Sequence, residues 1–178
     1  MGMVLQGFAG DISEQQRDFL ERAYASNERQ LHIINDILYL AKLDAGRIVL
    51  TKTKFDLAEL VRSSVDELAT SAKEAGITIS QHTPKKATVT ADSHMFRMVL
   101  ENLLTNAIKY TESGGEVTVR LVRLGDNYTV SVTDTGVGIE EKDIDKLFKQ
   151  FVRIPNERSS SVTGTGVGLY LAKSLILL

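Results

Sequence analysis

Two asparagines spaced four residues apart are the first side chains in this sequence with the chemistry to hold a metal. Asn102 and Asn106 belong to the pattern Asn-x-x-x-Asn-x-x-Lys-Tyr, which ends at Lys109 and Tyr110. Helical side chains four residues apart lie on one face, so both amide oxygens can reach a hard cation such as Mg²⁺. Lys109 suits phosphate charge, and Tyr110 offers a flat surface for a base. Taken alone, the pattern is more typical of an amphipathic helix without a ligand than of a metal or nucleotide site.

A carboxylate and two glycines form a second motif. Asp134 ends an expected strand, and Gly136 and Gly138 follow it. A carboxylate in that place can accept a hydrogen bond from the exocyclic amine of adenine, and the glycines let the backbone approach the ring closely. An ordinary strand-ending turn has the same residues, so this motif is also weak by itself.

A glycine-rich segment, Gly164-Thr-Gly-Val-Gly-Leu169, opens an expected helix that begins near Val167. Glycines give free backbone N–H groups close access to phosphate, and the helix N-terminus adds a favourable partial charge. The segment is not a Walker loop, because Gly-Lys-Ser/Thr is missing. It does not follow a strand at the spacing of a Rossmann motif either.

Two aromatic residues, Phe148 and Phe151, lie between the glycine motifs in a polar segment, 140–163, that we expect to form a mobile lid. They would fold over a ligand, dock the lid on a neighbour, or form a small apolar cluster under a loop. In their order along the chain, the four motifs describe a pocket that holds a base at one end and phosphates at the other. They predict binding of Mg-ATP.

The helix that carries the asparagines is expected to have three sides, at about 100° per residue. Its core side comprises Phe96, Val99, Leu100, Leu103 and Ala107. Arg97, Glu101 and Thr105 lie opposite, towards solvent. The polar motif falls on the border of the core side, where the wall of a pocket is expected.

Capping residues and periodicity place the other elements. Ser13 is expected to cap a long helix over 14–45, and its apolar stripe requires a partner helix. Further elements are expected as helices over 56–74, capped by Asp56, and from Asp92 or Ser93 onwards, and as strands over 77–82, 87–91, 116–124 and 128–134.

Composition narrows the function classes. The 178 residues are 43% hydrophobic and 25% charged, which is normal for a globular protein. A net charge of −2 without a basic stripe argues against nucleic acid, and the lack of cysteine excludes disulfides and thiolate metal sites. No apolar run approaches the ~20 residues of a membrane span. We therefore expect a soluble, cytoplasmic chain, whether or not a parent protein is attached to a membrane.

The four motifs resemble the N box, first glycine box, F box and second glycine box of two-component sensor histidine kinases. The similarity covers residues 14–178 and includes Asn35 to Gly46, which resembles the end of the second helix of the dimerisation and phosphotransfer domain. It implies an α+β chain: a Bergerat-type α/β sandwich, with a mixed sheet covered on one face by helices, preceded by a long dimerisation helix. The implied domains are 1–47, a partial dimerisation domain, and 48–178, an ATP-binding domain that is truncated at its C-terminus.

The resemblance implies a role for each matched residue. Asn102 and Asn106 would hold Mg²⁺ and would act in catalysis together with Lys109 and Arg153. The other implied contacts to the nucleotide come from Tyr110, Asp134, Gly136, Gly138, Ile139, Phe148, Phe151, Gly164, Thr165, Gly166, Val167, Gly168 and Leu169. The implied partners are ATP or ADP, a second copy through residues 14–45, and the receiver domain of a response regulator.

One position favours a kinase over an ATPase. Related ATPases of the gyrase, mismatch-repair and chaperone types have a Glu four residues before the Mg-binding Asn, where this chain has Asn102. Glu101 points about 140° away from Asn106 and cannot easily replace it. Without a placed base, water is a poor nucleophile, so transfer to a protein group is favoured over hydrolysis.

The family's phosphoacceptor motif, His-Glu-x-x-x-Pro, is not found in this sequence, since His32, His82 and His94 lie in other contexts. We therefore expect the chain to bind nucleotide but not to phosphorylate itself. Two alternatives remain open: a serine kinase of the anti-sigma-factor type on the same fold, and a non-catalytic interaction module controlled by nucleotide.

Overall fold

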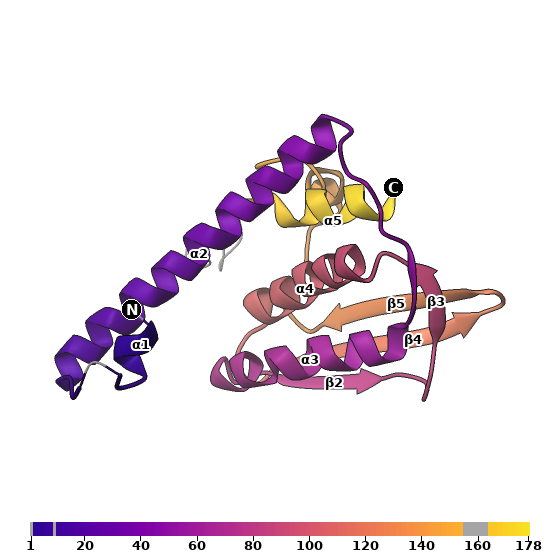
Figure 1. Cartoon of the computed structure of the whole chain (residues 1–178). Helices are drawn as coiled ribbons and strands as arrows, with labels where there is room; N and C mark the ends of the chain where they lie inside the picture. Colours follow the sequence, from indigo (N-terminus) through magenta and orange to yellow (C-terminus); the bar gives the residue numbers. More distant parts are fainter. Residues whose placement is uncertain (1, 9, 155–163) are drawn as a thin grey trace. The chain divides into compact units, whose positions relative to one another are not determined.

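The computed structural model describes residues 2–8, 10–154 and 164–178 (Figure 1). It divides into two compact units, Met1–Arg47 and Ile48–Leu178, and each unit is described by itself. Among the described residues, no helix combines the length and the apolar character that crossing a membrane requires.

The first unit consists of a short helix α1, Gly2–Leu5, and a long helix α2, Glu14–Asp44. A capping box starts α2: the Ser13 hydroxyl accepts from Gln16 N, and the Gln16 side chain accepts from Ser13 N at 2.9 Å. The predicted helix and its cap are confirmed. Arg17 Nη1 donates to the carbonyl of Leu5 at 3.3 Å and links the two helices.

Large apolar side chains are exposed along α2. Because a helix with such a stripe cannot bury it on itself, α2 presents a surface that suits a second helix. The exposed side chains are Phe19, Tyr24, Leu31, Ile33, Ile34, Ile37 and Leu38.

The second unit is a helix layer on a mixed sheet (Figure 1). In the three-stranded sheet, β4 lies in the centre, parallel to β2 and antiparallel to β5. A separate antiparallel ribbon joins β1 and β3. The elements are β1 Thr53–Asp56, α3 Leu57–Glu74, β2 Thr78–His82, β3 Thr88–Ala91, α4 Ser93–Tyr110, β4 Glu116–Leu124, β5 Asn127–Asp134, the 3₁₀ helix η1 Glu141–Lys146 and α5 Gly168–Ile176.

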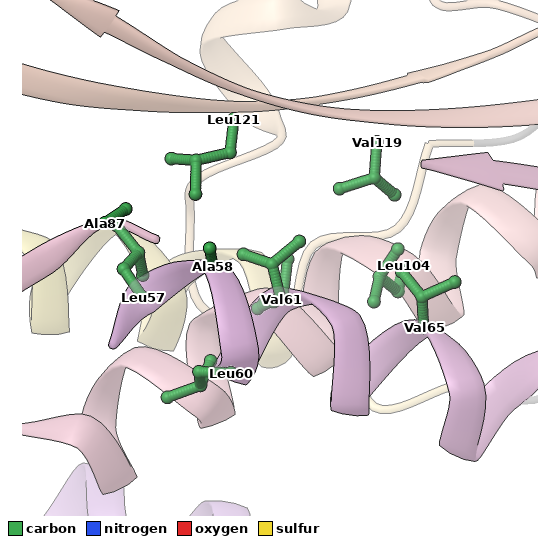
Figure 2. Packing of buried hydrophobic residues seen from close by; sticks show 10 residues of the cluster. Leu57, Ala58, Leu60, Val61, Val65, Ala87, Leu104, Val119 and Leu121 are labelled. Atoms are coloured by element: carbon green, nitrogen blue, oxygen red, sulfur yellow. The ribbon is translucent and has the colours of Figure 1, made fainter. Parts of the chain in front are cut away.

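The core lies between the sheet and helices α3 and α4 (Figure 2). Along β4, Val117, Val119 and Leu121 are buried and alternate with Thr118 and Arg120, of which Arg120 is exposed. Since side chains of a strand alternate between its two faces, the helices cover one face of the sheet, as expected for the fold class. From the helix side, Val61, Val65 and Leu104 pack against this face.

The core side of α4 differs from the prediction. Leu104 and Ile108 are buried, whereas Leu103 is only half-buried and faces α5. Arg97 is not simply solvent-exposed: its guanidinium bonds Glu67 of α3 at 2.9 Å. The reason is that α4 packs against α3, α5 and the sheet, so one ideal stripe cannot describe its buried surface.

Aspartates cap α3 and α4. Asp56 Oδ1 accepts from Ala58 N at 3.0 Å and from Ala87 N at 2.9 Å, and the Ala87 N–H in particular lowers the pKa of Asp56. Asp92 accepts from Met95 N at 3.1 Å and from Thr51 N at 2.8 Å, and the Met95 N–H contributes most to its lowered pKa. Asp92 therefore fixes the start of the helix that carries the polar motif.

Candidate functional site

The end of α4 and the end of β5 are joined through the main chain. Val137 N donates to the carbonyl of Tyr110 at 3.2 Å, and Gly136 N donates to Asp134 Oδ1 at 2.9 Å. A Cβ at Gly136 would lie 2.5 Å from the Tyr110 oxygen and 2.7 Å from Asp134 Oδ1. Only glycine fits between them, so the first glycine motif holds an exposed carboxylate beside the end of α4.

Two threonines that the sequence analysis did not select reinforce this joint. Thr111 is buried, and its hydroxyl donates to the carbonyl of Ala107 at 2.7 Å. Thr135 Oγ1 accepts from Glu116 N at 2.9 Å, while Thr135 N donates to Glu116 O at 3.1 Å. Each threonine directly follows a motif residue, Tyr110 or Asp134, and this adjacency was the available signal.

At its middle, α4 meets the start of α5. Asn102 is half-buried, and its Nδ2 donates to the carbonyl of Met98 at 2.9 Å. A Cβ at Gly168 would overlap Asn102 Oδ1. Asn106 is also half-buried and lies one turn closer to Tyr110. The asparagine motif and the second glycine motif therefore meet, as the pocket hypothesis requires.

The start of α5 is the N-terminus of a helix and lies next to the glycine motif. Its first helical bond runs from Leu171 N to Val167 O at 2.9 Å, and Val167 N donates to Thr165 Oγ1 at 3.3 Å. The N–H groups of the first turn have no partner within the helix. Gly166 has a φ of +71°, and a Cβ there would lie 2.8 Å from Val152 O. The loop before α5 thus packs against the segment that follows Phe151.

Comparison with known proteins places these features in a family. Residues 91–178 match the family of histidine kinase-, DNA gyrase B- and HSP90-like ATPases, and residues 3–46 match the His Kinase A phospho-acceptor domain. The non-motile and phage-resistance protein of Caulobacter vibrioides is 37% identical over 98% of this chain and 21% of its own length. The circadian input-output histidine kinase CikA of Synechococcus elongatus is 35% identical over 97% of this chain and 23% of its own length.

A solved structure agrees with these relatives. Full-length ShkA, crystallised in complex with AMPPNP, superposes with a TM-score of 0.76 at 27% identity, over 98% of this chain and 36% of the ShkA chain. The chain belongs to the sensor histidine kinases. It spans about a fifth of the length of the two curated relatives, 21% and 23%.

The family confirms the predicted fold class, and it does not favour the serine-kinase alternative. The discriminating feature is the match of residues 3–46 to the phospho-acceptor domain of histidine kinases, in addition to the shared ATPase fold. The long helix α2 lies within that match. In this histidine kinase core, the ATPase-type region therefore follows a segment of the phospho-acceptor domain in the sequence.

The two phenylalanines of the F box differ in their surroundings. Phe148 lies under Lys173 of α5, whose Nζ is 5.2 Å from the ring centroid. Phe151 is 64% exposed and has a φ of +60°, which is uncommon for a residue with a side chain. Phe148 also lines a cavity of about 260 Å³ between α4 and α5, together with Val99, Leu103, Leu169, Ala172, Lys173, Ile176 and Leu177.

The remaining predicted residues are solvent-exposed. Lys109, Gly138, Arg153 and Gly164 are exposed, as is Ile139 at 52%. The predicted lid falls partly on residues 155–163, which lie outside the described residues. Its described part contains the 3₁₀ helix η1.

Proposed function

We propose that this chain is the Mg-ATP-binding catalytic core of a histidine kinase, which transfers the γ-phosphoryl group of ATP to a histidine on a phospho-acceptor helix. One observation carries the proposal: α4 contacts the first glycine motif at Tyr110 and the second one at Asn102. Tyr110 lies eight positions after Asn102, which corresponds to roughly 12 Å of helix. This length suits an adenine nucleotide that lies along α4.

At the adenine end, the Asp134 carboxylate accepts a hydrogen bond from the exocyclic amine. The Gly136 N–H already bonds Asp134 Oδ1 at 2.9 Å, so the carboxylate is oriented before the base arrives. Gly138 and Ile139 border this end, and the ring of Tyr110 packs near the adenine and ribose. Because a charged acceptor strengthens a hydrogen bond, Asp134 distinguishes adenine from bases that lack the amine.

At the phosphate end, the backbone of the second glycine motif binds the anion. The N-terminus of α5 supplies the N–H groups of its first turn and the positive end of the helix dipole. Lys109 and Arg153 add positive charge, and Phe148 and Phe151 attach the lid. The backbone contacts come from Gly164, Thr165, Gly166, Val167, Gly168 and Leu169.

The residues fit Mg²⁺ that arrives with the nucleotide. Within the described ranges, no cluster of three or more His, Cys, Asp or Glu side chains exists that would form a protein cage for a metal. An amide oxygen of the asparagine motif, completed by phosphate oxygens and water, meets the preference of Mg²⁺ for oxygen ligands. When bound, the ion neutralises charge on the transferring phosphoryl group.

Transfer to a protein side chain is supported over hydrolysis. Asn102 stands where the related ATPases have a glutamate, and an amide cannot take a proton from water. Catalysis then rests on positioning of the phosphoryl group and on charge neutralisation. These are the contributions that the α4 and α5 motifs supply.

The partners follow from the first unit. The exposed apolar stripe of α2 and the phospho-acceptor match over residues 3–46 support a homodimer through residues 14–45. Residues 1–47 are then part of the dimerisation and phosphotransfer domain, and residues 48–178 are the ATP-binding domain. In the parent protein, the phosphoryl group passes on to the receiver domain of a response regulator.

Phosphotransfer to a supplied acceptor tests the proposal. The chain is incubated with γ-labelled ATP and a separate protein that carries a His-Glu-x-x-x-Pro helix. We expect label on that histidine, in an acid-labile bond, and none when the acceptor His is replaced by Ala. Acid-stable label on serine would support the serine kinase, and ATP binding without transfer would support the interaction module.

A further inference from the structure

Asn102 and Gly168 form a close contact between α4 and α5. A Cβ built on Gly168 would overlap Asn102 Oδ1 and lie 3.3 Å from its Cγ. Any side chain at position 168 would therefore displace the amide or push α5 away from α4. The contact requires both the glycine and the short, planar amide opposite it.

The amide of Asn102 is oriented by its own helix. Its Nδ2 donates to the carbonyl of Met98 at 2.9 Å, and this leaves Oδ1 directed at Gly168. The oxygen that a metal would require is thus in contact with the first residue of α5. Asn106 belongs to the same polar strip, one turn closer to Tyr110.

An apolar gap lies on one side of this contact. The cavity of about 260 Å³ is lined by Val99 and Leu103 of α4 and by Leu169 and Ala172 of α5. Leu103 and Leu169 are the sequence neighbours of Asn102 and Gly168. Dispersion contacts are lost across this gap. On the buried side of the helix, Val167 and Leu171 are fully buried, so apolar packing there and the Asn102–Gly168 contact beside the gap together fix the start of α5.

We propose that Asn102 is a positioning residue, which holds the phosphate-binding N-terminus of α5 in place through Gly168, and that Asn106 alone supplies the amide ligand for the metal. The inference rests on the proposed function and divides the work of its two asparagines. Backbone N–H groups bind an anion well only at hydrogen-bond distance, so a small displacement of α5 weakens phosphate binding. The adenine end, which is built on main-chain hydrogen bonds between α4 and the segment after β5, is unaffected.

Nucleotide affinity with and without Mg²⁺ separates the two roles. Asn102→Ala is expected to weaken ATP binding roughly 10- to 100-fold, equally in Mg²⁺ and in EDTA. Asn106→Ala is the matched control and should weaken binding only when Mg²⁺ is present. Adenosine, which carries no phosphate, should bind both variants as it binds the wild type. An Asn102→Ala penalty that disappears in EDTA would show that Asn102 is a metal ligand and would overturn the inference.

A double variant tests the contact itself. Gly168→Ala alone should weaken ATP binding, because its Cβ overlaps the amide of Asn102. Removing that amide makes room, so Asn102→Ala/Gly168→Ala should bind ATP no more weakly than the weaker single variant. Additive losses would contradict a direct contact.

Two controls keep the outcomes distinct. Adenosine binding and unfolding without nucleotide report whether a variant is folded; if Asn102→Ala fails there, Asn102→Ser replaces it, since its hydroxyl can bond the Met98 carbonyl. If the wild-type chain binds neither ATP nor adenosine, the proposed function and this inference both fail. If the wild-type chain binds both ligands but the loss of affinity in Asn102→Ala depends on Mg²⁺, this inference fails and the proposed function stands.

Discussion

The two ends of the site are built by different kinds of interaction. The adenine end is held by main-chain hydrogen bonds, such as Val137 N to Tyr110 O at 3.2 Å, which tie a helix to the sheet. The phosphate end depends on glycines that allow close packing, Gly168 against Asn102 and Gly166 against Val152. The first end is therefore preformed with the sheet, whereas the second depends on where α5 is placed. Substitutions at the first end should disturb the junction between α4 and the sheet, and those at the second end should displace α5.

The largest effect is expected for Gly136→Ala. Its Cβ would lie 2.5 Å from Tyr110 O and would separate β5 from α4. We expect a loss of about 1–3 kcal/mol in the free energy of unfolding, as for overpacked sites, and roughly 100-fold weaker binding of both adenosine and ATP. Urea unfolding and calorimetric titration measure these two quantities.

Gly164→Ala is the control for this change, since a Cβ there meets no atom of the described residues within 4 Å. Its unfolding free energy should stay within about 0.5 kcal/mol of the wild type. If Gly136→Ala were equally mild, the adenine end would not be the rigid part of the site.

Gly166→Ala should affect the phosphate end alone. With φ at +71° and Val152 O at 2.8 Å from the new Cβ, the substitution strains the loop before α5. A left-handed residue with a side chain costs about 1–2 kcal/mol, which corresponds to roughly 10-fold weaker ATP binding. Adenosine affinity should not change. An equal loss for adenosine and ATP would mean that the two ends are not independent.

Asp92→Ala should disturb both ends together, because Asp92 caps α4. Losing this cap should cost about 1 kcal/mol of unfolding free energy at pH 7. The pKa of Asp92 is lowered in the folded chain, mainly by the Met95 N–H. Its contribution is therefore present above the unfolded pKa of about 3.9 and is lost as the pH falls through the folded pKa.

Urea unfolding at pH 7 and pH 3 measures this dependence. The difference between wild type and Asp92→Ala should shrink at the lower pH. Asp126→Asn, at an exposed turn, should show no such trend. A difference that stays constant with pH would contradict a role for the carboxylate charge.

The smallest effect is expected for Lys173→Met, which removes the cation over Phe148 but keeps much of the side-chain length. The Nζ lies 5.2 Å from the ring centroid, and a contact at such an exposed site contributes about 0.5–1 kcal/mol. Thermal unfolding measures the change. A destabilisation far above this range would show that the phosphate end is anchored by Phe148 rather than by Asn102.

Local sequence signals predicted much of the fold. Ser13, Asp56 and Asp92 cap the helices as expected, because a cap involves only residues a few positions apart. The sequence pattern predicted Leu103 on the core side of α4, whereas the structure buries Leu104 instead, and this difference could not be predicted from local signals. It depends on which elements pack on α4, and this is a tertiary property.

The motifs predicted which residue types form the site but not which contact each residue makes. Nothing in the spacing shows that Asn102 faces Gly168, since the two residues lie far apart in the sequence. Phe148 and Phe151 are likewise the same residue type, yet only Phe148 lines the cavity between α4 and α5. Such contacts follow from the placement of α5, which no local pattern encodes.

Thermal unfolding with and without Mg-ADP, for the wild type and for Asp134→Ala, tests the central claim most directly. Ligand at ~100 times its dissociation constant should stabilise the folded wild type by about 2.7 kcal/mol. The account predicts a clear upward shift of the melting temperature that Asp134→Ala abolishes. A cooperative wild-type transition that does not move with Mg-ADP, or a shift that survives in Asp134→Ala, would contradict it.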